Sequence, residues 1–218
     1  MRARATDQSH RAGLITAGVA AGAVALAVAG CASSAHSASP GASGSATSHH
    51  PMSPRSHPMA ERTPFGSDCG MVPSTGMGSF HAMSMDRVLT AAAHNPLLTT
   101  FAADVKMAGL AGDLNSMHTL TVFAPANSAF KKLPAAEMAM MHSAAELAKI
   151  LKYHVVSGRV TPAELASGMT VKTLQGGALK GAKMGSVYEV NNAQVICGNI
   201  RTANATVYVI NKVLIPMH

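Results

Sequence analysis

The three cysteines of this chain, Cys31, Cys69 and Cys197, are its residues with the most specific chemistry. None is close enough to another to form a CxxC pair, so the redox and zinc motifs that use this spacing are excluded. The motifs HExxH, GxSxG, the phosphate-binding P-loop and GxGxxG after a strand are also absent from the sequence. Serine, histidine and aspartate occur, but no pattern places a nucleophile beside a base. We therefore expect that the protein is not an enzyme.

Histidine and methionine form a second set of reactive side chains, concentrated between Cys31 and Met85. Imidazole and thioether groups suit copper ions, but the spacing here is irregular and repeats no motif. A compositionally biased linker explains the same residues, with Met77, Met83 and Met85 partly in a folded core. We expect no cofactor, and we keep an envelope copper- or metal-binding protein as the alternative function. Its ligands would be His49, His50, Met52, His57 and Met59.

The charge pattern argues against a nucleic-acid partner. The chain has 17 Lys and Arg against 10 Asp and Glu, a formal net charge of +7. These positive charges are scattered, and only Lys131 and Lys132 are adjacent. Nucleic-acid binding usually needs a clustered basic face, often with aromatic side chains. The sequence has no Trp, 3 Tyr and 5 Phe, so we expect no binding to nucleic acid.

The N-terminus has the pattern of an export signal. Several arginines precede an uncharged, apolar segment at residues 12–30, which ends in small residues just before Cys31. The end of this segment resembles a bacterial lipobox, although Val28 stands where leucine is usual. We therefore predict a lipoprotein signal peptide over 1–30, with lipidation of Cys31. A retained transmembrane anchor and ordinary cleavage with free secretion are the alternatives.

The segment at residues 31–67 is predicted to be a disordered linker. It consists mainly of Ser, Ala, Gly, Pro and His, with almost no large apolar residue. Such a composition buries too little surface to offset the loss of chain entropy. We expect a flexible tether that holds a folded domain, residues 68–218, away from the membrane. Its serines and threonines are candidate O-glycosylation sites.

Hydrophobic spacing predicts that the folded domain begins with helices. Residues 84–108 are expected to form two helices broken at Asn95–Pro96, because proline disfavours helical backbone at and before its own position. The buried face of the first would be formed by Met85, Val88, Leu89 and Ala92. Further helices are expected at 135–143, 144–153 and 161–167. In the last of these, Thr161 is the N-cap and Glu164 completes a capping box.

Strands are predicted mainly in the second half of the domain. Alternating apolar residues indicate a strand at 119–127 and a short one at 154–158. After Gly168, short β segments separated by Gly and Asn span 169–174, 178–182, 187–191, 193–197, 199–204 and 206–216. Early helices followed by late strands argue for an α+β domain with an antiparallel sheet.

Several segments resemble signatures of the fasciclin-like domain family. "TVFAPANSAF" at 121–130 resembles the first signature, and "ILKYHVVSGRV" at 150–160 resembles the second. "NNAQVICGNIRTANATVYVINKVLIP" at 191–216 resembles the terminal strands. The likeness is greatest to the secreted fasciclin-domain antigens and cell-surface lipoproteins of mycobacteria, and it covers residues 68–216.

The resemblance carries expectations about fold and function. It implies an antiparallel β-sandwich or wedge with a helical cap. It also implies adhesion or extracellular protein interaction rather than catalysis. The partners would be extracellular or cell-surface proteins or glycans, bound by the surface of a monomeric domain. Together with the signal sequence, it predicts a lipid-anchored protein on the outer side of the cell membrane, with secretion left open.

The first signature is interpreted as scaffold. Pro125 would fix the exit from a strand, and Asn127 would be the N-cap of the helix that carries Phe130. Phe123 and Phe130 have the chemistry of packing rather than of catalysis. We therefore assign these four residues a structural role.

The second signature allows two interpretations of Tyr153 and His154. A Tyr-His neighbourhood is an adhesion determinant in some fasciclin-like domains, so the resemblance implies that this pair binds a partner. The other interpretation is a buried, hydrogen-bonded histidine at a helix-to-strand junction, surrounded by apolar residues. We favour the buried histidine and keep the pair as candidate partner-binding residues.

A disulfide is predicted between Cys69 and Cys197. With Cys31 lipidated, these two cysteines remain as an even pair in an oxidising compartment. Their bond would tie the segment that enters the domain to a late strand. Two free thiols are the alternative.

Overall fold

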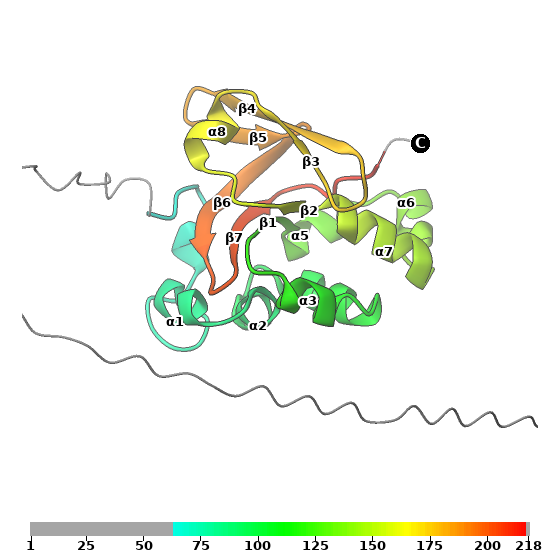
Figure 1. Cartoon of the computed structure of the whole chain (residues 1–218), viewed down its shortest axis with the longest axis horizontal. Helices are drawn as coiled ribbons and strands as arrows, with labels where there is room; N and C mark the ends of the chain where they lie inside the picture. The colour runs from blue at the N-terminus through cyan, green and yellow to red at the C-terminus, as the bar shows by residue number, and fades with distance from the viewer. Residues whose placement is uncertain (1–62, 217–218) are drawn as a thin grey trace, which may run out of the picture. The chain divides into compact units, whose positions relative to one another are not determined.

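The computed structural model describes residues 63–216, whose course is shown in Figure 1. The predicted signal peptide, Cys31, the tether up to residue 62 and the candidate metal ligands at 49–59 lie outside the described residues. No helix within 63–216 is both long enough and apolar enough to cross a membrane.

The described residues contain eight α-helices and one 3-10 helix. The break predicted at Asn95–Pro96 is confirmed, because one helix ends at His94 and the next begins at Thr99. The bounds are η2 (Cys69–Met71), α1 (Phe80–Met85), α2 (Val88–His94), α3 (Thr99–Met107), α4 (Ala111–Ser116), α5 (Asn127–Phe130), α6 (Ala135–Met140), α7 (Ala144–Tyr153) and α8 (Pro162–Ala166). The capping box of α8 is also confirmed: the Thr161 side chain accepts from the Glu164 amide, and the Glu164 carboxylate accepts from the Thr161 amide.

Seven strands form one sheet in the order β2-β1-β7-β6-β5-β4-β3. Their bounds are β1 (Leu120–Pro125), β2 (Val155–Ser157), β3 (Thr170–Lys172), β4 (Ala178–Met184), β5 (Val187–Val190), β6 (Ala193–Arg201) and β7 (Ala205–Ile210). The two edges of the sheet meet at a bridge between Val156 and Thr173. The Leu174 amide also donates to the Val155 carbonyl at 2.7 Å, so the sheet nearly closes into a barrel.

The prediction of a purely antiparallel sheet is wrong. Strands β1 and β7 are parallel, with Leu120 opposite Ala205 and Pro125 opposite Ile210, so the sheet is mixed. The other pairs in the sheet are antiparallel. The alternation of side chains shows that a segment is a strand but carries no information about the direction of its neighbour. Both central strands are buried along their whole length, which suits strands covered on two faces.

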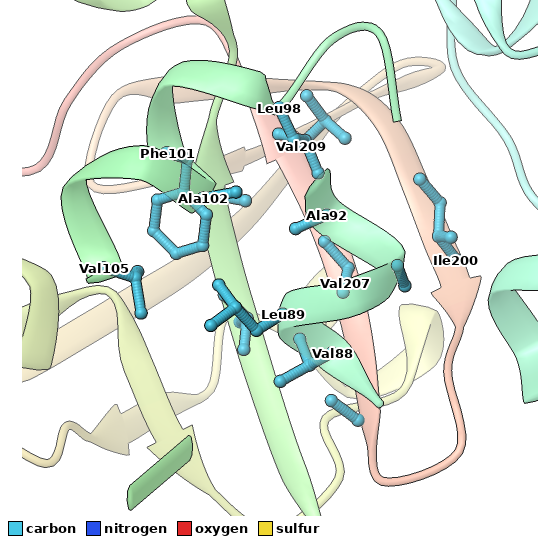
Figure 2. Packing of buried hydrophobic residues seen from close by; sticks show 14 of the residues in the cluster. Val88, Leu89, Ala92, Leu98, Phe101, Ala102, Val105, Ile200, Val207 and Val209 are labelled. Atoms are coloured by element: carbon cyan, nitrogen blue, oxygen red, sulfur yellow. The ribbon is translucent and has the colours of Figure 1, made fainter. Parts of the chain in front are cut away.

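The core has two parts, one on each face of the central strands. Val207 and Val209 of β7 face the helices, where they join Phe101 and other side chains from α2 and α3 (Figure 2). Tyr208 and Ile210, which alternate with them, face the inside of the near-barrel. The two-residue period of a strand therefore divides β7 between two apolar clusters.

The first predicted helix is two helices. Asp86 and Arg87 have extended backbone between α1 and α2. Met85 and Val88 therefore lie on different helices, and Met85 is 69% exposed, whereas Met83 is buried. Met77 is exposed as well, so the prediction that all three methionines lie partly in the core holds only for Met83.

Candidate functional site: a pocket beside the C-terminal segment

Cys69 and Cys197 form a disulfide with an S–S distance of 1.99 Å and a Cα–Cα distance of 4.9 Å. Cys69 lies on η2 and Cys197 on β6, so the bond ties the entering segment to a central part of the sheet. Nearby, the Asp68 amide donates to the Ile196 carbonyl at 2.9 Å. The bond spans 128 residues, and the chain-entropy treatment assigns such a loop about 5 kcal/mol of stabilisation.

The residues of the first signature lie mostly inside the domain. Phe123 is fully buried and stacks on Tyr208, with ring centroids 5.5 Å apart. Pro125 ends β1, and Phe130 packs into the helix-side core from α5. Phe123, Pro125 and Phe130 therefore have structural roles.

Asn127 has a different role from the one predicted. Ala126, not Asn127, is the N-cap of α5, and it makes no side-chain cap. The side-chain oxygen Oδ1 of Asn127 instead accepts from the Thr100 amide at 2.9 Å, and its side-chain Nδ2 donates to the Pro96 carbonyl at 2.9 Å. Asn127 therefore caps α3 across the fold. Sequence alone could not show this, because Thr100 lies 27 residues earlier in the chain.

His154 is fully buried and uses both ring nitrogens. Nδ1 lies 2.8 Å from the Ile150 carbonyl, to which it donates, and Nε2 accepts from the Leu214 amide at 2.9 Å. These two bonds require the neutral ring with its proton on Nδ1. Burial lowers the pKa of His154 from 6.5 to about 4, and the bond to Ile150 offsets part of this shift. The imidazole therefore joins α7 to the C-terminal segment as a neutral group.

Tyr153 is also buried and forms a second link. Its hydroxyl donates to the Ala178 carbonyl and accepts from the Asn191 side-chain amide, both at 3.0 Å. The side-chain oxygen Oδ1 of Asn191 accepts from the Lys180 amide at 2.8 Å. Neither Tyr153 nor His154 presents its side chain on the surface in this structure. His154 is fully enclosed, whereas Tyr153 is 5% exposed and lines the pocket described below. The partner-binding role that the resemblance implies stays a prediction for both residues.

These two residues hold the sides of a pocket with a volume of about 640 Å³, which we call the C-terminal pocket. It lies between residues of β3, β4 and β5 and the segment 212–215 that follows β7. Its lining includes Tyr153, Lys180, Glu189, Asn191, Lys212 and Val213. Sequence reasoning missed it because its residues come from segments far apart in the chain. Only the Tyr-His pair pointed to the region.

The C-terminal pocket has the chemistry of a binding surface. Its charged lining residues are Lys180, Lys212 and Glu189. Among the described residues, no group of three or more His, Cys, Asp or Glu is placed to hold a metal ion. The lining can therefore recognise charge, hydrogen-bonding groups and apolar side chains.

The mixed sheet, the covering helices and the disulfide define an α+β domain. A sequence model of the family described as "Fasciclin domain" matches residues 96–216, more than half of the chain. The chain belongs to this family.

Relatives from mycobacteria support the assignment. The chain is 43% identical over 152 residues to immunogenic protein MPB70 of Mycobacterium bovis, covering 65% of this chain and 75% of that protein. It is also 43% identical over 148 residues to the cell surface glycolipoprotein MPB83 of the same species, covering 65% of this chain and 66% of that protein.

A solved FAS1 domain pair from the insect cell adhesion molecule Fasciclin I is 23% identical, with a TM-score of 0.47, covering 55% of this chain and 45% of that one.

Proposed function

We propose that this protein is exported and anchored by lipid at the cell surface, where its fasciclin domain mediates adhesion or another extracellular protein interaction. The match to the fasciclin domain family is the observation that carries the proposal. One relative is named a cell surface glycolipoprotein and another an immunogenic protein. Both names suit a protein that is displayed outside the cell.

Two features of this chain support the location. The small residues before Cys31 follow an apolar segment, as in a lipoprotein signal. The Cys69–Cys197 disulfide suits an oxidising compartment outside the cytoplasm. More than one acyl chain on Cys31 would make anchoring stable, because a single chain binds membranes only marginally.

Replacing the acceptor cysteine tests the anchor. In the native host, Cys31→Ala should carry no lipid and should accumulate as unprocessed or released forms, because no thiol remains to be acylated. Val28→Leu is the matched control and should leave the protein in the membrane fraction. Cells that carry the anchored protein should adhere to extracellular protein more strongly than cells that carry Cys31→Ala. Equal lipid attachment in both variants, measured by intact mass, would refute lipidation at Cys31.

Metal binding remains the second candidate function. His49, His50, Met52, His57 and Met59 lie outside the described residues, but the methionine-rich pattern continues into the described part, where Met71, Met77 and Met85 are 62–69% exposed. Exposed thioethers are available to soft ions such as Cu(I). Calorimetric titration of the full chain with copper should show no saturable site if adhesion is the function, and a saturable site would favour this alternative.

A further inference from the structure

We propose that the C-terminal pocket binds an acidic, extended segment of a partner protein. This inference rests on the proposed function and names where the fasciclin domain meets its partner and which chemistry it recognises. Three independent features of the described residues carry it: charge, unpaired backbone groups and a preorganised wall.

The charge of the pocket favours an anionic ligand. Lys180 and Lys212 are both exposed on its lining, and neither forms an ion pair within residues 63–216. Glu189 is the carboxylate among the lining residues, so the lining has a net charge of +1, from two lysines and one glutamate. Two free ammonium groups on one pocket can pair with carboxylates spaced along a peptide.

The backbone beside the pocket has unused hydrogen-bonding groups. Strand β7 ends at Ile210, and the last bond to the neighbouring strand runs from the Asn211 amide to the Gln194 carbonyl at 3.0 Å. In the segment that follows, the Leu214 amide donates a hydrogen bond to Nε2 of His154. No hydrogen bond within the described residues involves the amides of Lys212, Val213 or Ile215. An extended peptide can satisfy such groups by pairing alongside them.

The walls of the pocket are fixed before any ligand arrives. The Leu214–His154 bond holds the C-terminal segment, and the Tyr153 hydroxyl with the Asn191 amide holds the opposite wall. A site that is already ordered loses less conformational entropy on binding. Tyr153 and His154 therefore act as positioning residues, which gives the second signature a role although both side chains are buried.

The same lining favours a peptide over a glycan. Tyr153 is the aromatic residue among the lining residues, and it is only 5% exposed, so the pocket offers no open aromatic face for a sugar ring. The half-buried side chains of Val213 and Ile215 instead suit apolar residues placed between acidic ones. A segment that alternates acidic and apolar side chains fits both the charges and this wall.

The test uses the full chain in detergent and a blocked ten-residue peptide of alternating glutamate and valine as the probe. Calorimetry gives the affinity, and hydrogen exchange with mass spectrometry locates the contact. The double variant Lys180→Gln/Lys212→Gln should weaken binding about tenfold or more, because it removes two charge-assisted contacts. Lys131→Gln/Lys132→Gln is the matched control, since it removes the same charge from exposed positions that do not line the pocket. It should leave the affinity unchanged.

Bound peptide should slow amide exchange in the segment 211–216, where the unpaired groups lie. The proposal is overturned if the peptide does not bind, if both double variants weaken binding equally, or if protection appears elsewhere. Binding of a neutral or acidic oligosaccharide in place of the peptide also overturns it. These outcomes leave the proposed function standing, because surface anchoring and adhesion of cells are measured separately through Cys31.

Discussion

At the scale of single residues, the imidazole of His154 joins the end of α7 to the C-terminal segment through its two ring nitrogens. The ring is completely enclosed, so its protonated form would lose its hydration and would also place a proton against the Leu214 amide. The chemistry that makes histidine useful at active sites is therefore suppressed here. What remains is a rigid connection between two segments that form the pocket.

This burial predicts a pH-dependent stability. Above pH 6.5, His154 is neutral in both the folded and the unfolded chain and contributes no pH dependence. As the pH falls from 6.5 to 4, the unfolded chain binds a proton that the folded chain does not. The free energy of unfolding should therefore fall by about 3 kcal/mol over this window and no further below it.

Denaturant unfolding at a series of pH values measures this effect. His154→Gln should be less stable at neutral pH but should lose most of the slope between pH 6.5 and 4. His142→Gln, at an exposed position on the surface, should keep the slope of the unaltered protein. An unchanged slope in His154→Gln would show that other groups cause the pH dependence.

At the scale of elements, α3 depends on a cap from a distant part of the chain. Asn127 accepts from the Thr100 amide in the first turn of α3 and donates to the Pro96 carbonyl and to the Thr99 hydroxyl at 3.0 Å. The Asn127 backbone amide adds a bond to the Leu97 carbonyl at 2.8 Å. The first signature thus fixes the start of a helix that carries Phe101 into the core.

Asn127→Ala should lower the free energy of unfolding by about 1 kcal/mol, the usual value of a lost helix cap. Thermal and denaturant unfolding measure it directly. Ser128→Ala is the matched control, because Ser128 is exposed on the same short helix and has no hydrogen bond among those described, and it should have little effect. Equal effects of the two changes would refute the capping role.

The elements also show which parts of the fold the sequence could reveal. The break at Pro96 and the capping box at Thr161 follow from local chemistry, and both were predictable. The parallel pairing of β1 with β7 joins Leu120 to Ala205, and nothing local encodes it. The division between α1 and α2 was hidden because their apolar residues happen to match one helical face.

The candidate site was less predictable than the fold. The Tyr-His pair lies beside the C-terminal pocket, but its buried position depends on contacts with Ala178 and Leu214. The C-terminal pocket exists only when β4, β5 and the chain after β7 come together. Patterns within one segment can predict a strand or a helix, but they cannot predict which segments share a surface.

At the scale of the whole molecule, the Cys69–Cys197 bond connects the entrance of the domain to the sheet. Phe65 extends this connection. It forms an antiparallel β-bridge with Gly198 on β6, and the centroids of the Phe65 and Tyr188 rings are 4.5 Å apart. If the chain is anchored at Cys31, mechanical force along the chain would reach the domain where Phe65 and Cys69 are attached to β6. We therefore expect the lipid and the disulfide in the same molecule.

Intact mass of the protein from the native membrane fraction, measured before and after reduction, tests both requirements together. We expect the mass of residues 31–218 plus diacylglyceryl or triacyl groups, and a gain of two hydrogens when the one disulfide is reduced. An unlipidated chain in the medium would contradict the anchor. A mass unchanged by reduction would contradict the covalent link at the entrance of the domain.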